Sequence, residues 1–163
     1  MLFFIHLETR RVSRVGLTPY PDQEWMEQQA RNLTMEEWGW LRGGRYLLHD
    51  RDTKFCESFR ELIEWGSVNP IRLPARSPNL NSYAERCVRS VKEECVAKLI
   101  LLGESSLRRA LQQYLLHYHE ERNHQGKENR ILFPFPKARR KEGAVQCRER
   151  LGGLLKYYER EAA

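Results

Sequence analysis

The sequence has no apolar run long enough to cross a membrane. Its longest apolar runs, Met1–Ile5 and Leu99–Leu102, are far shorter than the roughly 20 residues that a transmembrane helix needs. The N-terminus also lacks the basic region, apolar stretch and small-residue cleavage site of a secretory signal peptide. We therefore expect a cytoplasmic protein with no membrane partner.

Cysteine is scarce as well, with four residues and no CxxC pair. Cysteines this sparse in a chain of this length are typical of reduced thiols inside the cell. A zinc site built from cysteines with His117, His119 and His124 is conceivable. Structural zinc usually shows paired ligands at short spacing, however, so the pattern does not favour one.

The 163 residues are enough for one domain of ordinary size. Hydrophobic residues make up 40% and charged residues 31%, which predicts a folded chain with a core. The net charge of +6 is uneven: from Lys127 onward ten Lys or Arg stand against five Asp or Glu, and residues 1–126 carry only +1. We therefore expect a near-neutral domain over residues 1–126 and a basic tail over residues 127–163. Such a tail favours a polyanionic partner.

Apolar periodicity predicts alternating strands and helices. Strands are predicted over residues 2–5, 11–15, 45–49 and 68–73. Helices are predicted over residues 22–34 and 55–66, from residue 82 onward, and over 105–121. Residues 74–81 are predicted to form an irregular loop. This order predicts an α/β fold in which helices flank a mixed sheet.

The inner faces of the last two helices follow from their apolar spacing. They are expected to carry Ala84, Val88 and Val91 in the first of them and Leu107, Leu111, Leu115 and Tyr118 in the second. Beyond Gly126 the periodicity decays. Residues 150–160 are expected to form a short amphipathic helix or to have no fixed structure.

Two carboxylates stand where ligands bind in open α/β sheets. Asp50 ends a predicted strand, and Glu85 lies in the first turn of the helix that follows the irregular loop. Two converging carboxylates suit Mg²⁺, which leaves its other positions to water and phosphate. The same positions suit a structural role, in which Asp50 caps a helix and Glu85 complements a helix dipole. Spacing alone favours the structural role.

The residues around the carboxylates change that balance. Residues 49–55 (HDRDTKF) resemble the motif around the second acid of DDE transposases and retroviral-type integrases, in which an aromatic follows the Asp five positions on. Residues 77–86 (SPNLNSYAER) resemble the stretch that carries the third acid, and residues 89–94 (RSVKEE) continue that match. Residues 118–126 (YHEERNHQG) are similar to the segment that follows the core in insertion-sequence transposases.

The resemblance implies a ribonuclease-H-like core that cleaves and joins DNA with two Mg²⁺ or Mn²⁺ ions. It assigns Asp50 as the second catalytic acid and Glu85 as the third, both as metal ligands. Asp52 is a rival for the second acid, but Phe55 lies at the expected offset from Asp50. The resemblance also implies DNA partners, namely the ends of a mobile element and its target, and a homo-oligomer.

Basic side chains supply candidate DNA contacts. Arg89 and Lys92 follow Glu85 on one face of the predicted helix, where related integrases contact DNA near the reacting end. A solvated helix face is the alternative for this pair. In the tail, Lys137, Arg139, Arg140 and Lys141 lie beside Phe133 and Phe135, a composition that suits nonspecific nucleic-acid contact. A solubilising tail is the alternative there.

The first acid of the family is missing from the sequence. Residues 2–11 resemble the second strand of the core, so the first strand and its Asp are expected to be absent. His6 stands where related proteins often carry an Asp that is not catalytic, and we expect an ordinary strand histidine. A chain without the first acid is expected to have no DNA-joining activity alone. The strand edge left bare is expected to promote weak self-association.

Three classes of function therefore compete. The first is a catalytic DDE recombinase, either whole or completed by something outside this chain. The second is a non-catalytic, nucleic-acid-binding remnant of a transposase. The third is a DNA-binding or assembly module unrelated to catalysis, which the two acid-bearing motifs disfavour.

Overall fold

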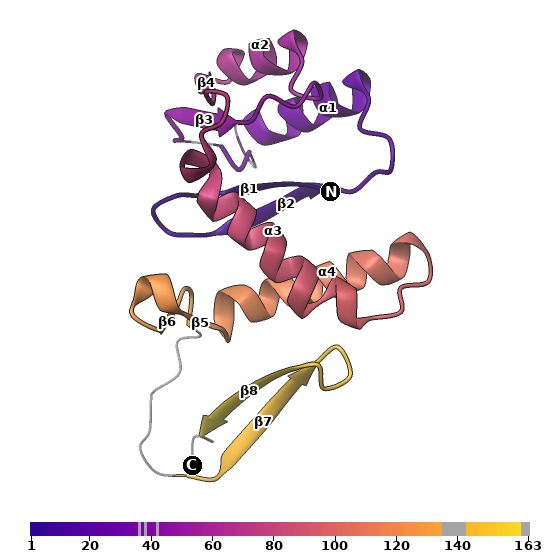
Figure 1. Ribbon diagram of the computed structural model, residues 1–163, viewed down its shortest axis with the longest axis vertical. Coiled ribbons are helices and arrows are strands. Elements are labelled where there is room, and N and C mark those ends of the chain that lie inside the picture. Colours follow the sequence, from indigo (N-terminus) through magenta and orange to yellow (C-terminus); the bar gives the residue numbers. More distant parts are fainter. Residues whose placement is uncertain (36, 38, 42, 135–142, 161–163) are drawn as a thin grey trace. The chain divides into compact units, whose positions relative to one another are not determined.

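The computed structural model describes residues 1–35, 37, 39–41, 43–134 and 143–160, and shows short strands and helices in alternation (Figure 1). The strands are β1 (Leu2–Ile5), β2 (Val12–Gly16), β3 (Tyr46–His49), β4 (Asn69–Arg72), β5 (Asn123–His124), β6 (Arg130–Ile131), β7 (Val145–Arg150) and β8 (Leu155–Arg160). The α-helices are α1 (Gln23–Thr34), α2 (Glu57–Trp65), α3 (Ser82–Glu94) and α4 (Gly103–Glu120). Single turns of 3₁₀-helix are η1 (Pro78–Asn81), η2 (Val96–Lys98) and η3 (Gln125–Lys127).

The predicted α/β class is confirmed, but the single mixed sheet is wrong. The described strands form four separate two-stranded sheets, β1–β2, β3–β4, β5–β6 and β7–β8. A single sheet would need a strand that pairs with both β1 and β3, and no described residue forms one. Among the described residues, no further strand pairs with either edge of any of the four sheets.

The chain divides into two compact units. The first contains Met1–Phe4 and Ser13–Ala84, and the second contains Ile5–Val12 and Glu85–Ala163. The described residues of the tail thus belong to the same unit as α4. The domain boundary expected at residue 126 stays a prediction.

In the first unit, α1 begins where the sequence predicts. The carboxylate of Asp22 accepts a hydrogen bond from the backbone N–H of Trp25 at 2.8 Å, which satisfies one of the unpaired donors at the helix start. Met26, Ala30 and Leu33 then recur at helical spacing and are buried. They pack in one core cluster with Leu2, Phe4, Leu41, Leu47, Phe59, Ile63 and Val68. Through Leu47 this core holds β3, which directly precedes Asp50.

β3 and β4 are parallel, with His49 opposite Arg72 in the register. Along β3 the side chains alternate, so that Leu47 and His49 are buried while Tyr46 and Leu48 are exposed. Helix α2 returns the chain between the two strands and buries Phe59 and Ile63. It ends at Trp65 with Gly66 as its C-terminal cap, where the sequence predicted the end of the helix.

In the second unit, the buried faces of the helices differ from the predicted ones. Helix α3 buries Cys87 and Val91, while Ala84 and Val88 are only partly buried. Helix α4 buries Ala110, Leu111, Tyr114, His117 and Tyr118, so Leu107 and Leu115 lie at the margin of the buried face. Glu121, which directly follows α4, is buried and binds Arg150 of the C-terminal hairpin, so the buried face includes a polar group that apolar periodicity does not predict.

The turn between β1 and β2 is fixed to the end of α4. The backbone N–H of Val12 donates to Nε2 of His119 at 2.9 Å, and Lys127 donates to the carbonyl oxygen of Glu8 at 2.9 Å. His6 lies in this turn and contacts Thr9 through Nδ1, so the expectation of an ordinary strand histidine is corrected.

Residues 145–160 form a β-hairpin, so both expectations for residues 150–160, a short helix or no fixed structure, are wrong (Figure 1). β7 and β8 are antiparallel with six residue pairs, from Val145 opposite Arg160 to Arg150 opposite Leu155. The connection contains Gly152 and Gly153, both with positive φ, which glycine adopts without steric cost. The two glycines end any helix at this point and allow the chain to reverse.

In the described part of the chain, no helix is long and apolar enough to cross a membrane. The four cysteines are free thiols, as the sequence predicted.

Candidate active site

Asp50 follows the last residue of β3 and is held in a turn. One carboxylate oxygen, Oδ1, accepts a hydrogen bond from the backbone N–H of Asp52 at 3.1 Å. Asp and Asn form such side-chain turns because the carboxyl or amide oxygen reaches the amide two residues on. Asp50 itself is exposed. The contact restricts its side chain while leaving Oδ2 without a partner among the described residues.

Asp52, the rival for the second acid, binds Lys54 through both of its carboxylate oxygens. Its Oδ1 accepts from the backbone N–H of Lys54 at 3.1 Å, and its Oδ2 forms an ion pair with the Lys54 ammonium. These hydrogen bonds from Lys54, the side-chain one first, lower the pKa of Asp52. With both oxygens engaged, Asp52 shapes the turn, and Asp50 has the freer carboxylate.

The aromatic residue at the motif's fifth position supports the strand end. The Phe55 ring lies 5.0 Å from the His49 ring and 5.5 Å from the Phe59 ring, measured between ring centroids. Phe55 thereby links the end of β3 to helix α2. Its predicted place inside that helix is wrong, because the helix begins at Glu57.

The loop that leads to Glu85 is more regular than predicted. Within residues 74–81, Pro78–Asn81 form the 3₁₀ turn η1, with Pro78 at its first position, where a missing N–H costs nothing. Helix α3 starts directly afterwards at Ser82. Glu85 therefore lies in the first turn of α3, as the sequence predicted, and it is exposed.

The two acids fall in different units, Asp50 in the first and Glu85 at the start of the second. Their convergence on one site stays a prediction. Among the described residues no group of three or more His, Cys, Asp or Glu could hold a metal ion. The described residues therefore do not form the zinc site that was considered from the sequence. Carboxylates are nevertheless the correct donors for Mg²⁺, which takes one or two of them and keeps several waters.

Exposed cations follow Glu85 along α3. Arg89 and Lys92 are exposed and, within the described residues, form no ion pair. They lie four and seven positions after Glu85, so the three side chains share one helix face. Arg86, which the sequence reasoning did not assign, is a further exposed cation on this helix. The other predicted DNA contacts, Lys137, Arg139, Arg140 and Lys141, lie outside the described residues.

Three hydrogen bonds among Glu94, Tyr114 and Arg122 join the end of α3 to α4, and they were not predicted from the sequence. Arg122 donates to Glu94 at 2.7 Å and to the hydroxyl of Tyr114 at 3.0 Å, and that hydroxyl donates to Glu94 at 3.1 Å. Burial, the Glu94 charge and the hydrogen bond raise the pKa of Tyr114. The triangle fixes the C-terminal end of the helix that carries Glu85, Arg89 and Lys92.

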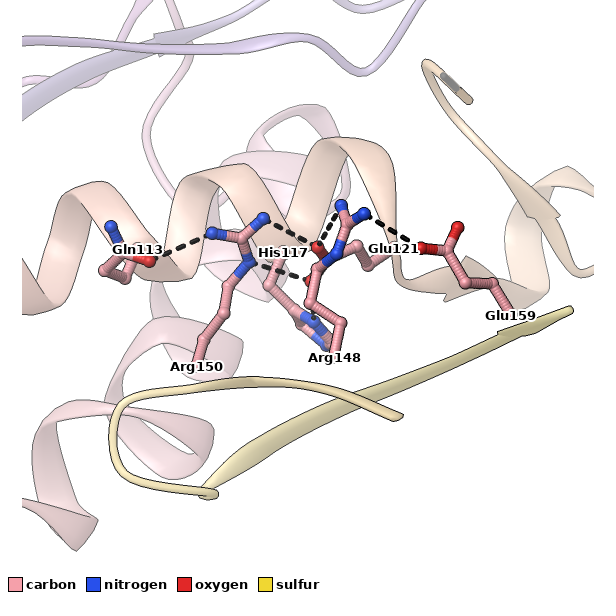
Figure 2. A network of polar contacts seen from close by, with 6 residues as sticks. All are labelled: Gln113, His117, Glu121, Arg148, Arg150 and Glu159. Carbon is pink, nitrogen blue, oxygen red and sulfur yellow. Dashed lines mark hydrogen bonds and ion pairs between the residues drawn. The ribbon is translucent and has the colours of Figure 1, made fainter. Parts of the chain in front are cut away.

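A second network attaches the C-terminal hairpin to α4 (Figure 2). Glu121 lies at its centre with a side chain that is 1% exposed, and it accepts two hydrogen bonds from Arg150. Figure 2 also shows His117 and Arg148 on the same carboxylate, with His117 Nδ1 3.1 Å from Oε2. Gln113 and Glu159 complete the network by binding Arg150 and Arg148.

Residues 67–130 match the family model of the integrase core domain. The matched segment contains Glu85, Arg89 and Lys92 but not Asp50. It supports an integrase or transposase catalytic core, and the resemblance read from the sequence is confirmed in this segment. Comparisons with curated proteins and with solved structures gave no match.

Proposed function

We propose that this chain is the catalytic core of a DDE-type transposase or integrase, a ribonuclease-H-like domain that acts on DNA. The observation that carries the proposal is the integrase-core match over residues 67–130, which contains Glu85 in the first turn of α3, followed by exposed cations that form no ion pair with the described residues. The class of protein is supported by that match. The reaction, the metal and the DNA are our proposals.

In this proposal Asp50 and Glu85 hold the divalent ions, Mg²⁺ or Mn²⁺. Bound ions would stabilise negative charge on a phosphodiester as one oxygen attacks and another leaves. Asp50 suits the task because its Oδ1 is restrained by Asp52 while Oδ2 has no partner among the described residues. Glu85 suits it because its carboxylate is exposed and lies in the first turn of α3.

Arg89 and Lys92 would neutralise DNA phosphates beside Glu85. Contacts to phosphates fix the position of a duplex without reading its sequence. The exposed faces of both side chains and the lack of ion pairs in the described residues support this role, because a cation already paired would have to break that pair first. The alternative of a solvated helix face predicts no effect of either residue on DNA affinity.

The second candidate function is a nucleic-acid-binding remnant without chemistry. It is favoured by one observation, namely that the described residues contain no cluster of three metal-binding side chains. Because the sequence supplies two of the three acids that the resemblance requires, we expect no strand transfer by this chain alone, even with Mn²⁺. Joining activity that disappears in Asp50→Ala would overturn that expectation.

The two candidates differ in their response to divalent metal. We would measure the affinity for a short duplex DNA by fluorescence anisotropy with and without Mn²⁺. The catalytic-core proposal expects Mn²⁺ to increase the affinity, and Asp50→Asn or Glu85→Gln to remove that increase. Asp52→Asn and Glu93→Gln, which change neighbouring carboxylates equally, should retain it. Complete indifference to Mn²⁺ in the folded protein would favour the remnant.

A further inference from the structure

His49 is the last residue of β3 and directly precedes Asp50. It is only 5% exposed, because the alternation of the strand turns Leu47 and His49 to the same buried side. A polar ring at such a position is unusual, since buried polar groups are costly unless they form hydrogen bonds. The hydrogen bonds of this ring therefore indicate what it does.

The ring has one hydrogen bond, and it goes to Asp50. Nδ1 of His49 lies 2.8 Å from the backbone carbonyl oxygen of Asp50. Because a carbonyl oxygen can only accept, Nδ1 is the donor, and in the neutral ring Nε2 then has a free lone pair. Nε2 is buried, and among the described residues it has no hydrogen-bond partner. The Phe55 ring, 5.0 Å away between centroids, packs against the imidazole.

An apolar side chain would fill this position without leaving a buried nitrogen unpaired. Leu47, two residues earlier on the same side of β3, does so. The specific contribution of a histidine is therefore its N–H to the Asp50 carbonyl. The Asp50 residue is then held at two points, its carbonyl by His49 and its carboxylate by the Asp52 amide.

We propose that His49 is a positioning residue, which fixes the peptide that carries Asp50 and so sets the direction of the Asp50 carboxylate. The importance of that direction rests on the proposed function, in which Asp50 binds a divalent ion. The positioning itself does not rest on it. Residues that orient a metal-binding side chain from behind typically change metal affinity 10- to 100-fold when they are removed.

The test compares three variants at one pH. His49→Leu removes the donor, and His49→Asn keeps an N–H at the place of Nδ1. Leu47→Ala is the control, because it weakens the same core without touching Asp50. Nitrogen NMR of the imidazole reports the tautomer, amide hydrogen exchange at Asp52 reports the Asp50 turn, and Mn²⁺ titration reports affinity at Asp50.

We expect the Nδ1–H tautomer in the unmodified protein. His49→Leu should accelerate exchange at Asp52 by about tenfold relative to Leu47→Ala, which corresponds to the loss of one hydrogen bond. His49→Asn should restore slow exchange, and Mn²⁺ affinity should fall about tenfold in His49→Leu. A proton on Nε2, or equal exchange at Asp52 in His49→Leu and Leu47→Ala, would overturn the positioning role. Absence of Mn²⁺ binding in the unmodified protein would instead count against the proposed function.

Discussion

Arg150 donates to both carboxylate oxygens of Glu121, from Nε to Oε2 at 2.9 Å and from Nη2 to Oε1 at 2.6 Å. The pair joins β7 to the end of α4, across 29 positions of sequence. Burial alone would raise the pKa of Glu121, but hydrogen bonds from Arg150 and His117 outweigh burial, and the pKa is lowered. The pair is thus the main polar attachment of the C-terminal hairpin.

Glu121→Gln should therefore loosen the hairpin. Removing one partner of a buried ion pair leaves an uncompensated charge, and we expect a loss of about 3 kcal/mol in the free energy of unfolding. Hydrogen exchange in residues 145–160 should accelerate at the same time. Glu128→Gln is the matched control, because Glu128 pairs with Arg130 while both side chains are 77% exposed. It should change stability by less than about 0.5 kcal/mol. Equal effects in urea unfolding would contradict the attachment.

His119 makes stability depend on pH. Burial, with Arg11 and His124 nearby, lowers the pKa of His119 from 6.5 to about 4. Its Nε2 must stay unprotonated to accept the hydrogen bond from Val12. Since the folded-state pKa lies below the unfolded one, this contribution is complete above pH 6.5 and is lost as the pH falls from 6.5 toward 4.

His119→Gln should flatten the pH dependence of stability in that window. The ring is only partly buried, so the slope should decrease by no more than about 1 kcal/mol per pH unit. Urea midpoints measured between pH 4 and 7 provide the comparison. An unchanged slope in His119→Gln would refute the assignment.

Arg122 and Glu94 should be energetically coupled. Their side chains are 28% and 35% exposed, and Tyr114 bonds to both. A double-mutant cycle with Arg122→Ala and Glu94→Ala should give a coupling of about 1 kcal/mol, the range found for residues in one polar network. The exposed pair Arg108 and Glu104 is the control, because helix-surface pairs at this spacing contribute only about 0.3–0.5 kcal/mol.

Local features of the fold were predictable from the sequence. The start of α1 followed from Asp22, and the place of Glu85 followed from the proline-rich loop, because caps and prolines act over a few residues. The C-terminal hairpin was missed although Gly152 and Gly153 mark its turn. The apolar pattern of residues 155–160 was interpreted with the period of a helix, whereas it has the period of two residues that a strand shows. Leu155, Tyr157 and Glu159 face one side of the hairpin.

In the candidate site, too, the residues of contiguous motifs were predictable from the sequence and the long-range contacts were not. Asp50, Glu85, Arg89 and Lys92 are recognisable because their motifs are contiguous in sequence. The contacts that fix α3 and the C-terminal hairpin are not contiguous, since Arg122 lies 28 positions from Glu94 and Arg150 lies 29 from Glu121. Such contacts depend on packing between distant elements, which periodicity does not encode.

The open edge of β1 predicts weak self-association. β1 pairs only with β2 among the described strands, so its other edge has unpaired backbone groups. Sedimentation velocity should show association that rises with concentration, and Phe3→Lys should reduce it, because lysines on edge strands oppose pairing. Tyr20→Lys is the control, since Tyr20 is 79% exposed and lies outside the strands. A monomer at every concentration would contradict the prediction.

The cations of α3 should determine how DNA affinity depends on salt. Each phosphate neutralised by a lysine or arginine releases counterions, so the logarithm of the affinity falls with the logarithm of salt by about 0.9 for each contact. Arg89→Ala and Lys92→Ala should therefore weaken binding to any duplex and each reduce the slope by about 1.

Lys98→Ala is the matched control for these two variants. Lys98 is an exposed cation in η2, outside α3, and its removal changes the net charge by the same amount. A general effect of net charge would lower the affinity equally in all three variants. A contact on the helix face of Glu85 requires the salt slope to fall for Arg89→Ala and Lys92→Ala and to stay unchanged for Lys98→Ala. Equal slopes throughout would remove α3 from the DNA interface and leave Arg89 and Lys92 as solvated surface residues.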